Sequence, residues 1–306
     1  MLVRAATQSV EVWTPAKLNL FLEVLSKRAD GFHEIETVMA PIDLHDTLIL
    51  QPAAHGRIDL HCRWASPAAQ PDAWRDIELP SGQRNIVVRA LEMLREGHAP
   101  RAGATVTLIK RIPLAAGLAG GSSDAAAALV AANLVWRMGM KRQQLQSVAA
   151  RLGSDVPFFL ENSAAICRGR GEQIVPLPGL VPLHLAVAYP AASLATADVY
   201  KACQPAQPAR RANDLQQAWQ AGDAALVGRL LHNRLQPAAA QLSPWIERLR
   251  QEFARQDVLG AQMSGSGSSY FGLCRNARHA RQVAERLRMR GLGHVYTCRT
   301  SCGFRC

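Results

Sequence analysis

The stretch Pro113-Leu-Ala-Ala-Gly-Leu-Ala-Gly-Gly-Ser-Ser-Asp124 decides the fold, because it joins a glycine-rich bend to an alanine-rich segment, 125–136, with the composition of a helix. Glycine has no Cβ atom, so the backbone at Gly117, Gly120 and Gly121 can turn sharply and approach a ligand closely. The start of a helix offers unpaired N–H groups and a partial positive charge to an anion. The stretch therefore predicts a phosphate-binding loop.

Each residue of this loop is a candidate contact for the phosphates of ATP. The hydroxyl groups of Ser122 and Ser123 can donate to phosphate oxygens or cap the helix. The loop is not a Walker A motif, which requires a lysine after its last glycine. An ordinary helix capped by a serine after a glycine-rich turn stays open as an alternative. The ATP-binding candidates in the loop are Pro113, Leu114, Ala115, Ala116, Gly117, Leu118, Ala119, Gly120, Gly121, Ser122 and Ser123.

Asp124 closes the loop with a negative charge. A carboxylate is favourable in the first turn of a helix, but it repels a triphosphate unless Mg²⁺ bridges the two groups or the side chain points away. Asp124, Ser122 and Ser123 are therefore candidate Mg²⁺ ligands. The sequence does not choose among them, so the metal ligands stay unknown at this point.

The hydrophobic periodicity of the remaining chain alternates between strand-like and helix-like segments. In 10–25, every second residue is apolar, which predicts a half-buried strand with Lys17 and Asn19 on its outer face. We expect further strands at 38–50, with Asp46 near a turn, and at 105–109, 183–189 and 295–298. We expect helices at 85–96, 125–136, 143–152, 214–235, 244–255 and 278–290, a strand, glycine turn and strand over 262–274, and loops at 65–80 and 203–212.

Length and composition limit the class of protein. At roughly 150 residues per domain, 306 residues favour two domains, which we place at 1–165 and 166–300 with a cysteine-containing tail at 301–306. A hydrophobic content of 48% with 19% charged residues suits a globular chain with a core. No apolar run approaches the roughly 20 residues that cross a bilayer. The N-terminus has no signal-peptide core. We therefore expect a soluble cytoplasmic protein that does not contact a membrane.

The formal net charge of +11 favours an anionic partner, either nucleic acid or a phosphorylated small molecule. Seven cysteines, an odd number and mostly scattered, argue against a secreted disulfide scaffold. Cys298, Cys302 and Cys306 do not have the spacing of a zinc site, so we expect a tail with free thiols.

Three segments occur in the order found in the GHMP kinase superfamily, which includes galactokinase, homoserine kinase and mevalonate kinase. The loop at 113–124 resembles the second motif of the superfamily, Gln262-Met-Ser-Gly-Ser-Gly-Ser268 resembles the C-terminal glycine motif, and Pro15-Ala-Lys-Leu-Asn-Leu-Phe21 resembles the N-terminal one. The flanks, 15–24 with 28–37, and Gly153-Ser-Asp-Val-Pro-Phe158, resemble the 4-diphosphocytidyl-2-C-methyl-D-erythritol kinase family. The matches span 15–272.

The resemblance implies an α+β fold with an N-terminal ribosomal protein S5 domain 2-like α/β domain and a C-terminal ferredoxin-like α/β domain. It implies transfer of the γ-phosphoryl group of ATP to the 2-hydroxyl group of 4-diphosphocytidyl-2-C-methyl-D-erythritol in non-mevalonate isoprenoid synthesis. Mg²⁺ is expected with ATP. The implied partners are these small molecules, without nucleic acid, and the chain is expected as a monomer or weak homodimer.

The resemblance also implies catalytic roles. Asp155 matches the general base of the family, which takes the proton of the acceptor hydroxyl, although Asp155 before Pro157 could also cap a helix. Lys17 matches the catalytic lysine, whose ammonium group stabilises the transferring phosphoryl group. Asn19 lies two residues on, on the same side of the strand, and could bind the same substrate.

The remaining implied contacts surround the two substrates. His33 matches the residue that reads cytosine, Phe32 stands where many members have tyrosine, and Tyr200 resembles the second stacking residue. Lys201 is expected near a phosphate. Asn85 and Lys110 align with positions near adenine, although Asn85 could simply cap the following helix. Gly265, Ser266 and Gly267 are expected to form a turn beside the substrate.

Two alternatives stay open. Another GHMP kinase would act on a different acceptor, such as homoserine or mevalonate. An RNA-binding protein would explain the net charge of +11, and both implied folds occur in such proteins. The aromatic content of only 6%, without an aromatic run of the RNP type, argues against RNA binding.

Overall fold

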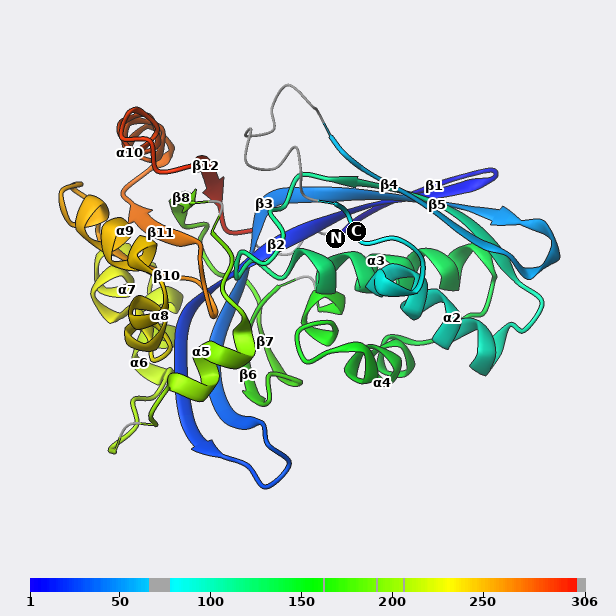
Figure 1. The fold of residues 1–306 in the computed structure, drawn as a ribbon, viewed down its shortest axis with the longest axis horizontal. Helices are drawn as coiled ribbons and strands as arrows, with labels where there is room; N and C mark the ends of the chain where they lie inside the picture. Colours follow the sequence, from blue (N-terminus) through cyan, green and yellow to red (C-terminus); the bar gives the residue numbers. More distant parts are fainter. Residues whose placement is uncertain (66–77, 162, 191, 206, 302–306) are drawn as a thin grey trace.

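The computed structural model describes residues 1–65, 78–161, 163–190, 192–205 and 207–301, and shows two lobes, each built from a β-sheet with helices packed on it (Figure 1). In this view the larger lobe, with α2, α3 and α4, lies on the right, and the smaller lobe, with α6 to α10, lies on the left. The predicted α+β class is confirmed.

The larger sheet is organised by one long antiparallel hairpin of β2 (Ser9–Lys27) and β3 (His33–Ala53). The hairpin connects two parts of the sheet. The second half of β3 pairs with β5 (Gly103–Lys110), and the first half of β3 pairs with β6 (Ala164–Gly169). The other strands of this sheet are β1 (Leu2–Ala6), β4 (Ile58–Trp64), β7 (Gln173–Leu177) and β9 (His232–Asn233).

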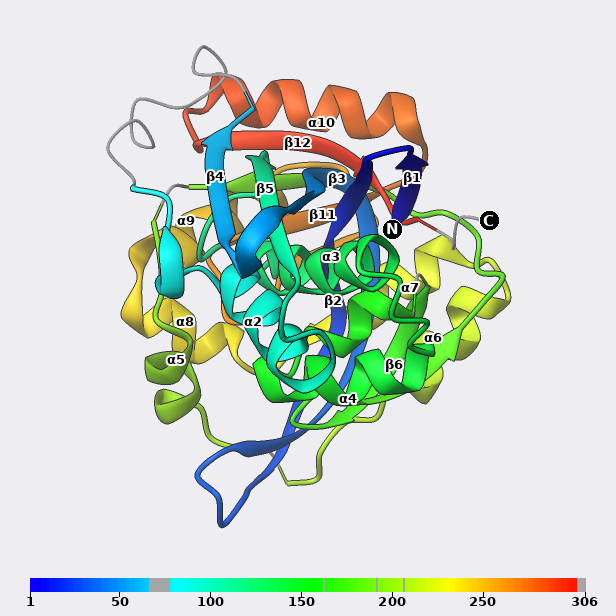
Figure 2. The same ribbon diagram turned by 90° about the vertical axis from the view of Figure 1, so that its right-hand side faces the viewer.

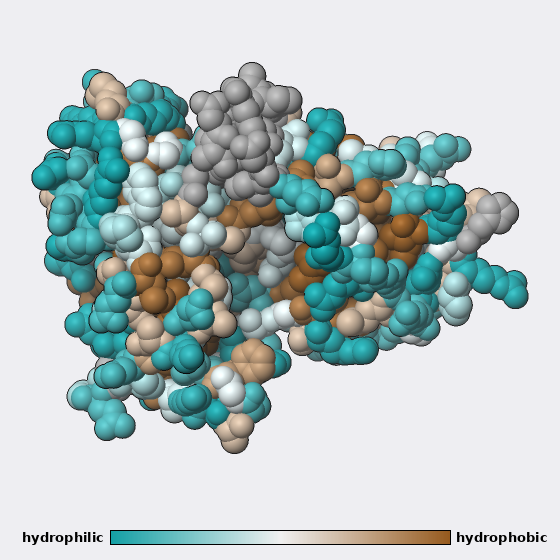
Figure 3. Space-filling view, viewed as in Figure 1, coloured by the Kyte–Doolittle hydropathy of each residue, from teal (hydrophilic) through white to brown (hydrophobic). Residues whose placement is uncertain are grey.

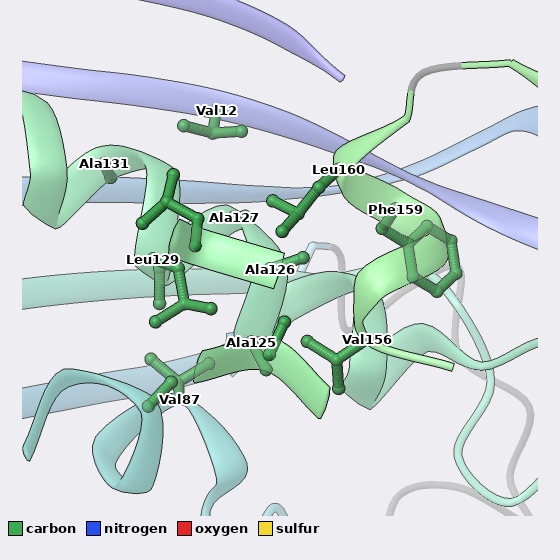
Figure 4. Close-up of a cluster of buried hydrophobic side chains, with 14 of the residues drawn as sticks. Val12, Val87, Ala125, Ala126, Ala127, Leu129, Ala131, Val156, Phe159 and Leu160 are labelled. Carbon is green, nitrogen blue, oxygen red and sulfur yellow. The ribbon is translucent and has the colours of Figure 1, made fainter. Parts of the chain in front are cut away.

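Helices α2 (Ile86–His98), α3 (Gly120–Val135) and α4 (Arg142–Leu152) cover this sheet, with short 3-10 turns at η1 (Ala54–Gly56), η2 (Gly82–Arg84) and η3 (Pro157–Leu160). Helix α3 contacts both β2 and β3. Its alanines are fully buried, and their small side chains let the helix axis lie close to the sheet. Ala125, Ala126 and Leu129 gather with Val156 and Leu160 in the resulting core (Figure 4).

The smaller lobe has an antiparallel sheet in the order β10 (Gly260–Met263), β11 (Tyr270–Cys274), β8 (His184–Tyr189) and β12 (His294–Arg299). Helix α10 (Ala277–Met289) runs alongside β12 (Figure 2). The other helices of this lobe are α5 (Thr196–Ala202), α6 (Asn213–Gln220), α7 (Ala224–Leu230), α8 (Gln236–Leu242) and α9 (Pro244–Ala254).

The lobes are joined by a buried ionic cluster around Glu23 on β2. The Glu23 carboxylate accepts hydrogen bonds from Arg234 Nε (2.7 Å) and Nη2 (3.2 Å) and from the backbone N–H of Arg210 (3.0 Å), and lies 3.1 Å from His232 Nε2. Burial opposes the charge, but these donors prevail and lower the pKa of Glu23. The short strand β9, which carries His232, pairs with β2 beside this cluster.

Most predicted elements are confirmed, including the strands within 10–25, 38–50, 105–109, 183–189 and 295–298 and the helices within 85–96, 143–152, 244–255 and 278–290. The half-buried strand at 10–25 is wrong in one respect. Lys17, Asn19, Phe21 and Glu23 are buried as fully as their apolar neighbours. Distant parts of the chain cover them: Gly117 and Asp155 contact Lys17, and Arg210 and Arg234 contact Glu23.

Two further predictions are corrected. Asp46 does not lie near a turn, but in the middle of β3, fully buried beside Lys110. The single helix expected at 214–235 is broken into α6, α7 and strand β9, because Gly222 takes a φ of 74° and Asp223 caps a new helix. Strands β1, β4, β6 and β7 were not predicted.

The predicted domain limits, 1–165 and 166–300, stay a prediction, and β6 and β7 extend the larger sheet to Leu177. Cys298 is a buried residue of β12, while Cys302 and Cys306 lie outside the described residues, as does most of the predicted loop at 65–80. Within the described ranges, no helix combines the length and the apolar character needed to cross a bilayer.

The core under α3 gives a stability prediction. Leu129→Ala should lower the free energy of unfolding by about 2–5 kcal/mol, because it removes a fully buried side chain and leaves a cavity. Leu134→Ala on the same helix is the control, since Leu134 is 47% exposed and its loss should cost within about 0.5 kcal/mol. Urea unfolding measures both, and equal losses would contradict the assigned core face.

Candidate active site

A cleft of about 470 Å³ lies between the two lobes. The surface is visibly hollowed there (Figure 3). Its walls come from β2, β3, the loop before α3, the turn at Asp155, the turn between β6 and β7, the start of α5 and the turn between β10 and β11. The predicted site residues on these walls are Lys17, Asn19, Pro113, Leu114, Ala115, Ala116, Gly117, Ala119, Gly120, Gly121, Ser122, Asp155, Tyr200, Gly265, Ser266 and Gly267.

The two glycine-rich loops of the sequence meet backbone to backbone at the floor of this cleft. A Cβ atom on Gly117 would lie 2.2 Å from the carbonyl oxygen of Ser264, so no other residue fits there without a shift of the backbone. The Ser264 hydroxyl donates to the Gly117 carbonyl (3.1 Å), and the N–H of Ser269 donates to the carbonyl of Ala116 (3.1 Å). One loop therefore fixes the other.

The phosphate loop reaches the cleft where α3 begins. Ala115 and Ala119 hold left-handed φ angles of 50° and 54°, a strained conformation that non-glycine residues adopt mostly at functional sites. Gly120, Gly121 and Ser122 open the helix and line the cleft, where the free N–H groups of the first turn favour an anion.

Two loop residues face away from the cleft. The Ser123 hydroxyl is buried and donates to the Pro15 carbonyl (2.6 Å), which ties the loop to β2. Leu118 is fully buried in the core between the lobes. Neither lines the cleft, so their expected contacts with ATP stay predictions.

Lys17 and Asp155, far apart in the sequence, meet in the cleft with Nζ and Oδ2 3.8 Å apart. Lys17 Nζ also donates to Asn19 Oδ1 (2.6 Å) and to the Gly117 carbonyl (3.1 Å). Asn19 is held in turn, because its Nδ2 donates to the Thr37 hydroxyl (2.8 Å). Burial lowers the pKa of Lys17, while the charge of Asp155 acts in the opposite direction.

Of the predicted cytosine residues, Tyr200 lines the cleft, whereas Phe32 and His33, at the tip of the β2–β3 hairpin, do not line it but contact residues that do. The rings of His33 and Tyr200 lie 5.2 Å apart at 33°, and Arg170 places its guanidinium 4.9 Å from the centre of the Phe32 ring. Phe32 is 53% exposed. Burial, with the charge of Lys27, lowers the pKa of His33 and favours its neutral form. Lys201 is exposed and does not line the cleft.

The residues predicted near adenine have structural partners. Asn85 caps α2 by accepting the N–H of Val87 (2.9 Å), which is the alternative that the sequence left open. Lys110 is buried between Asp46 and Asp124, with its Nζ 2.5 Å from Asp124 Oδ2. Neither residue lines the cleft, and their contacts with ATP stay predictions.

The Lys110 cluster, formed by Lys110, Asp46 and Asp124, lies directly behind the phosphate loop. A Cβ atom on Gly120 would lie 3.4 Å from Lys110 Nζ. Asp46 Oδ1 accepts the N–H groups of Arg111 and, at 2.9 Å, Ile112, the residue just before the loop. Burial raises the pKa of Asp124 well above its usual range, against the lowering effect of Lys110. Asp124 is buried and faces the core.

Four polar residues of the cleft wall were not predicted: Thr37, Ser154, Arg170 and Thr196. Arg170 had a weak signal, since it stands between Gly169 and Gly171, both with positive φ, in the turn joining β6 to β7. In the described part of the chain, no group of three or more His, Cys, Asp or Glu residues is arranged to hold a metal ion.

Comparisons with known proteins identify the family. The model of the GHMP kinases N terminal domain matches residues 85–163 and that of the GHMP kinases C terminal matches 215–291. The chain is 43% identical over 275 residues to 4-diphosphocytidyl-2-C-methyl-D-erythritol kinase of Pelotomaculum thermopropionicum, covering 89% of this chain and 92% of the relative. It is 36% identical to the same kinase of Alkaliphilus metalliredigens, covering 92% and 93%.

Solved structures of similar proteins support the same family assignment. A crystal structure of 4-(cytidine 5'-diphospho)-2C-methyl-D-erythritol kinase matches with a TM-score of 0.79 at 33% identity, over 96% of this chain and 100% of that chain. A homoserine kinase from Cytophaga hutchinsonii matches with a TM-score of 0.75, over 99% and 98% of the two chains, but at 20% identity it shows the shared fold alone. The resemblance to the GHMP kinase superfamily is confirmed.

The Lys110 cluster gives the second prediction. Lys110→Met should lower the free energy of unfolding by about 3–5 kcal/mol, because it leaves buried carboxylates without their cation. Asp124→Asn is the matched variant and should cost less, since Lys110 keeps Asp46 as its partner. Urea unfolding and the KM for ATP are measured together. A large rise in KM for ATP without loss of stability would instead support the adenine contact.

Proposed function

Because the chain belongs to the 4-diphosphocytidyl-2-C-methyl-D-erythritol kinase family of GHMP kinases and is an ATP-dependent kinase, we propose that it transfers the γ-phosphoryl group of ATP to the 2-hydroxyl group of 4-diphosphocytidyl-2-C-methyl-D-erythritol. This reaction is a step of non-mevalonate isoprenoid synthesis. The proposal rests mainly on one observation: Lys17 and Asp155 form a pair in the same cleft that the start of α3 lines.

ATP enters with its phosphates at the start of α3. The N–H groups of the first turn and the hydroxyl of Ser122 face the cleft, while the turn at Gly265, Ser266 and Gly267 forms the opposite wall. Phosphoryl transfer needs little covalent work from the protein, so positioning and charge stabilisation carry the catalysis. The interlocked glycine loops supply that positioning, since Gly117 cannot move without moving Ser264.

Asp155 is the proposed general base. Its side chain is 33% exposed in the cleft, so an acceptor hydroxyl can reach it, and a carboxylate at that place can take the hydroxyl proton as the oxygen attacks phosphorus. Lys17 is the proposed catalytic cation. Of the three N–H donors of its ammonium group, Asn19 and Gly117 engage two, which leaves the third for Asp155 or the phosphoryl group.

Mg²⁺ is proposed to enter with the phosphates of ATP. Mg²⁺ favours oxygen ligands and keeps several waters, so it needs few protein groups beside a nucleotide. The Ser122 hydroxyl, on the cleft wall in the first turn of α3, is an oxygen donor that fits this requirement. Asp124 and Ser123 fit it less well, because both side chains are buried and do not line the cleft. When bound, the ion would neutralise charge on the phosphates.

Cytidine is proposed to lie at Phe32, His33 and Tyr200. A neutral imidazole has one donor and one acceptor, which suits the mixed edge of cytosine, and the lowered pKa of His33 supports the neutral form. Phe32 offers a ring face for stacking but no hydroxyl group. Lys201 on α5 remains a proposed phosphate contact. We further propose a cytoplasmic monomer or weak homodimer without a nucleic acid partner.

The proposed substrate is tested by comparing acceptors. Purified chain with ATP and Mg²⁺ should phosphorylate 4-diphosphocytidyl-2-C-methyl-D-erythritol with a kcat/KM at least about 100-fold above that for homoserine or mevalonate, since the latter two leave the cytosine site empty. Release of ADP is measured in a coupled assay. Equal or greater activity on homoserine or mevalonate would assign the chain a different acceptor.

The proposed base is tested by Asp155→Ala. This change should lower kcat by about 100-fold or more while the dissociation constant of ATP stays within about threefold, because the base acts on the acceptor hydroxyl. Asp198→Ala is the control, an exposed acid on α5 near the cleft, and should keep full activity. An unchanged kcat in Asp155→Ala would remove this residue from the mechanism.

A further inference from the structure

We propose that Arg170, in the turn between β6 and β7, binds the diphosphate group that joins cytidine to the methylerythritol unit of the substrate. The inference rests on the proposed function, because it takes the nature of the substrate from there. None of the motifs in the sequence points to this residue, and no role was predicted for it.

The position of Arg170 connects the two ends of the acceptor site. The next residue, Gly171, lies beside the proposed base, since a Cβ atom on it would be 3.7 Å from Asp155 Oδ1. The guanidinium group of Arg170 lies at the other end, 4.9 Å from the centre of the Phe32 ring. A substrate with cytosine at Phe32 and its hydroxyl group at Asp155 must carry its diphosphate past Arg170.

The donors of Arg170 are available to a ligand. In the described parts of the chain, no hydrogen bond uses its guanidinium group. The carboxylate of Glu172 is 3.8 Å from Arg170 Nε, beyond hydrogen-bond range, and accepts the backbone N–H of Arg170 instead (2.7 Å). A guanidinium group has five N–H donors in a planar fork that matches two phosphate oxygens.

Neighbouring arginines show the contrast. Arg168, two residues earlier, donates from Nε to Glu36 (2.9 Å), and Arg28, in the β2–β3 hairpin, donates to Asp30 (3.2 Å) and Glu34 (2.7 Å). Both are engaged in holding the fold. Arg170 is partly exposed, with 33% of its side chain accessible, and among the described residues its guanidinium has a 3.8 Å ion pair with Glu172 but no hydrogen bond.

Charge balance in the cleft leads to the same residue. Among the described residues that line the cleft, Lys17 and Arg170 are the cations. Lys17 is engaged with Asn19 and Gly117 at the end where the phosphoryl group is transferred. The diphosphate of the acceptor brings negative charge to the other end, where Arg170 can neutralise it. Lys201 is less well placed, since it does not line the cleft.

A purely structural role would have a different consequence. If Arg170 only held the Phe32 ring in place, its loss would weaken the binding of every ligand that stacks on that ring, including cytidine itself. If Arg170 binds the diphosphate, its loss weakens only ligands that carry phosphate. The two roles are therefore separated by comparing cytidine, cytidine monophosphate and cytidine diphosphate.

The test measures the dissociation constants of these three ligands by calorimetry with the full chain and with Arg170→Met, which keeps a long side chain over Phe32 without the charge. In the unchanged chain, affinity should rise from cytidine to cytidine diphosphate. In Arg170→Met, cytidine diphosphate should bind about 10- to 100-fold more weakly, as for the loss of charged hydrogen bonds, while cytidine is unaffected. Arg170→Lys should recover part of the loss, and Arg28→Met should show none.

Three results would overturn the inference: unchanged affinity of Arg170→Met for cytidine diphosphate, an equal loss for cytidine, or no gain from the diphosphate in the unchanged chain. The measurement needs no turnover, so it is separate from the acceptor assay. A chain that phosphorylates the cytidine substrate but loses nothing in Arg170→Met refutes the inference alone. A chain with the expected binding but no such activity refutes the proposed reaction alone.

Discussion

The rest of the site depends on the contact between the backbones of Gly117 and Ser264. These residues lie in different lobes of the molecule, and there is no room between them for a side chain. The contact brings the carbonyl of Gly117 to Lys17 Nζ, while the N–H of Lys17 donates to the Leu118 carbonyl (3.0 Å). The strand β2, the phosphate loop and the turn before β11 therefore meet at one point, and the position of each depends on the other two.

Buried charge supports this junction from two sides. The Lys110 cluster connects β3, β5 and α3 behind the phosphate loop, and the cluster around Glu23 connects β2 with β9 and the chain at Arg210. Buried ion pairs contribute little net stability, since desolvation offsets their attraction. Their geometry is demanding, however, because an unpaired buried charge is costly. We infer that both clusters favour a single arrangement of the strands and loops around the cleft.

The sequence predicted the parts of the site that depend on local chemistry. The glycines and serines of 113–124 indicate a loop at the start of a helix without reference to the rest of the chain. The sequence could not show that Lys17 meets Asp155, or that Asp46 contacts Lys110, because these pairs depend on how distant segments pack. The alternation in β2 suggested a solvent-facing side, since no local pattern reveals that distant parts of the chain cover it. Arg170 was not predicted for the same reason. An arginine between two glycines is typical of an ordinary turn, and only the folded structure places its guanidinium in the cleft beside Phe32.

The proposed reaction requires one residue pair to act on both substrates, and the position of Lys17 and Asp155 in the cleft is compatible with this. The phosphate loop leads into α3, whereas Phe32 and His33 lie at the tip of the β2–β3 hairpin, where the His33 ring packs against Tyr200 of α5. Lys17 and Asp155 lie between these regions, on the strand and the turn that both regions share. In phosphoryl transfer the attacking and leaving oxygens lie roughly in line through phosphorus. In the proposed reaction, a nucleotide on one side of the pair and an acceptor hydroxyl on the other would satisfy that requirement. The long hairpin thus does more than build the sheet, because it carries Lys17 in the cleft and, at its tip, the proposed cytidine contacts Phe32 and His33.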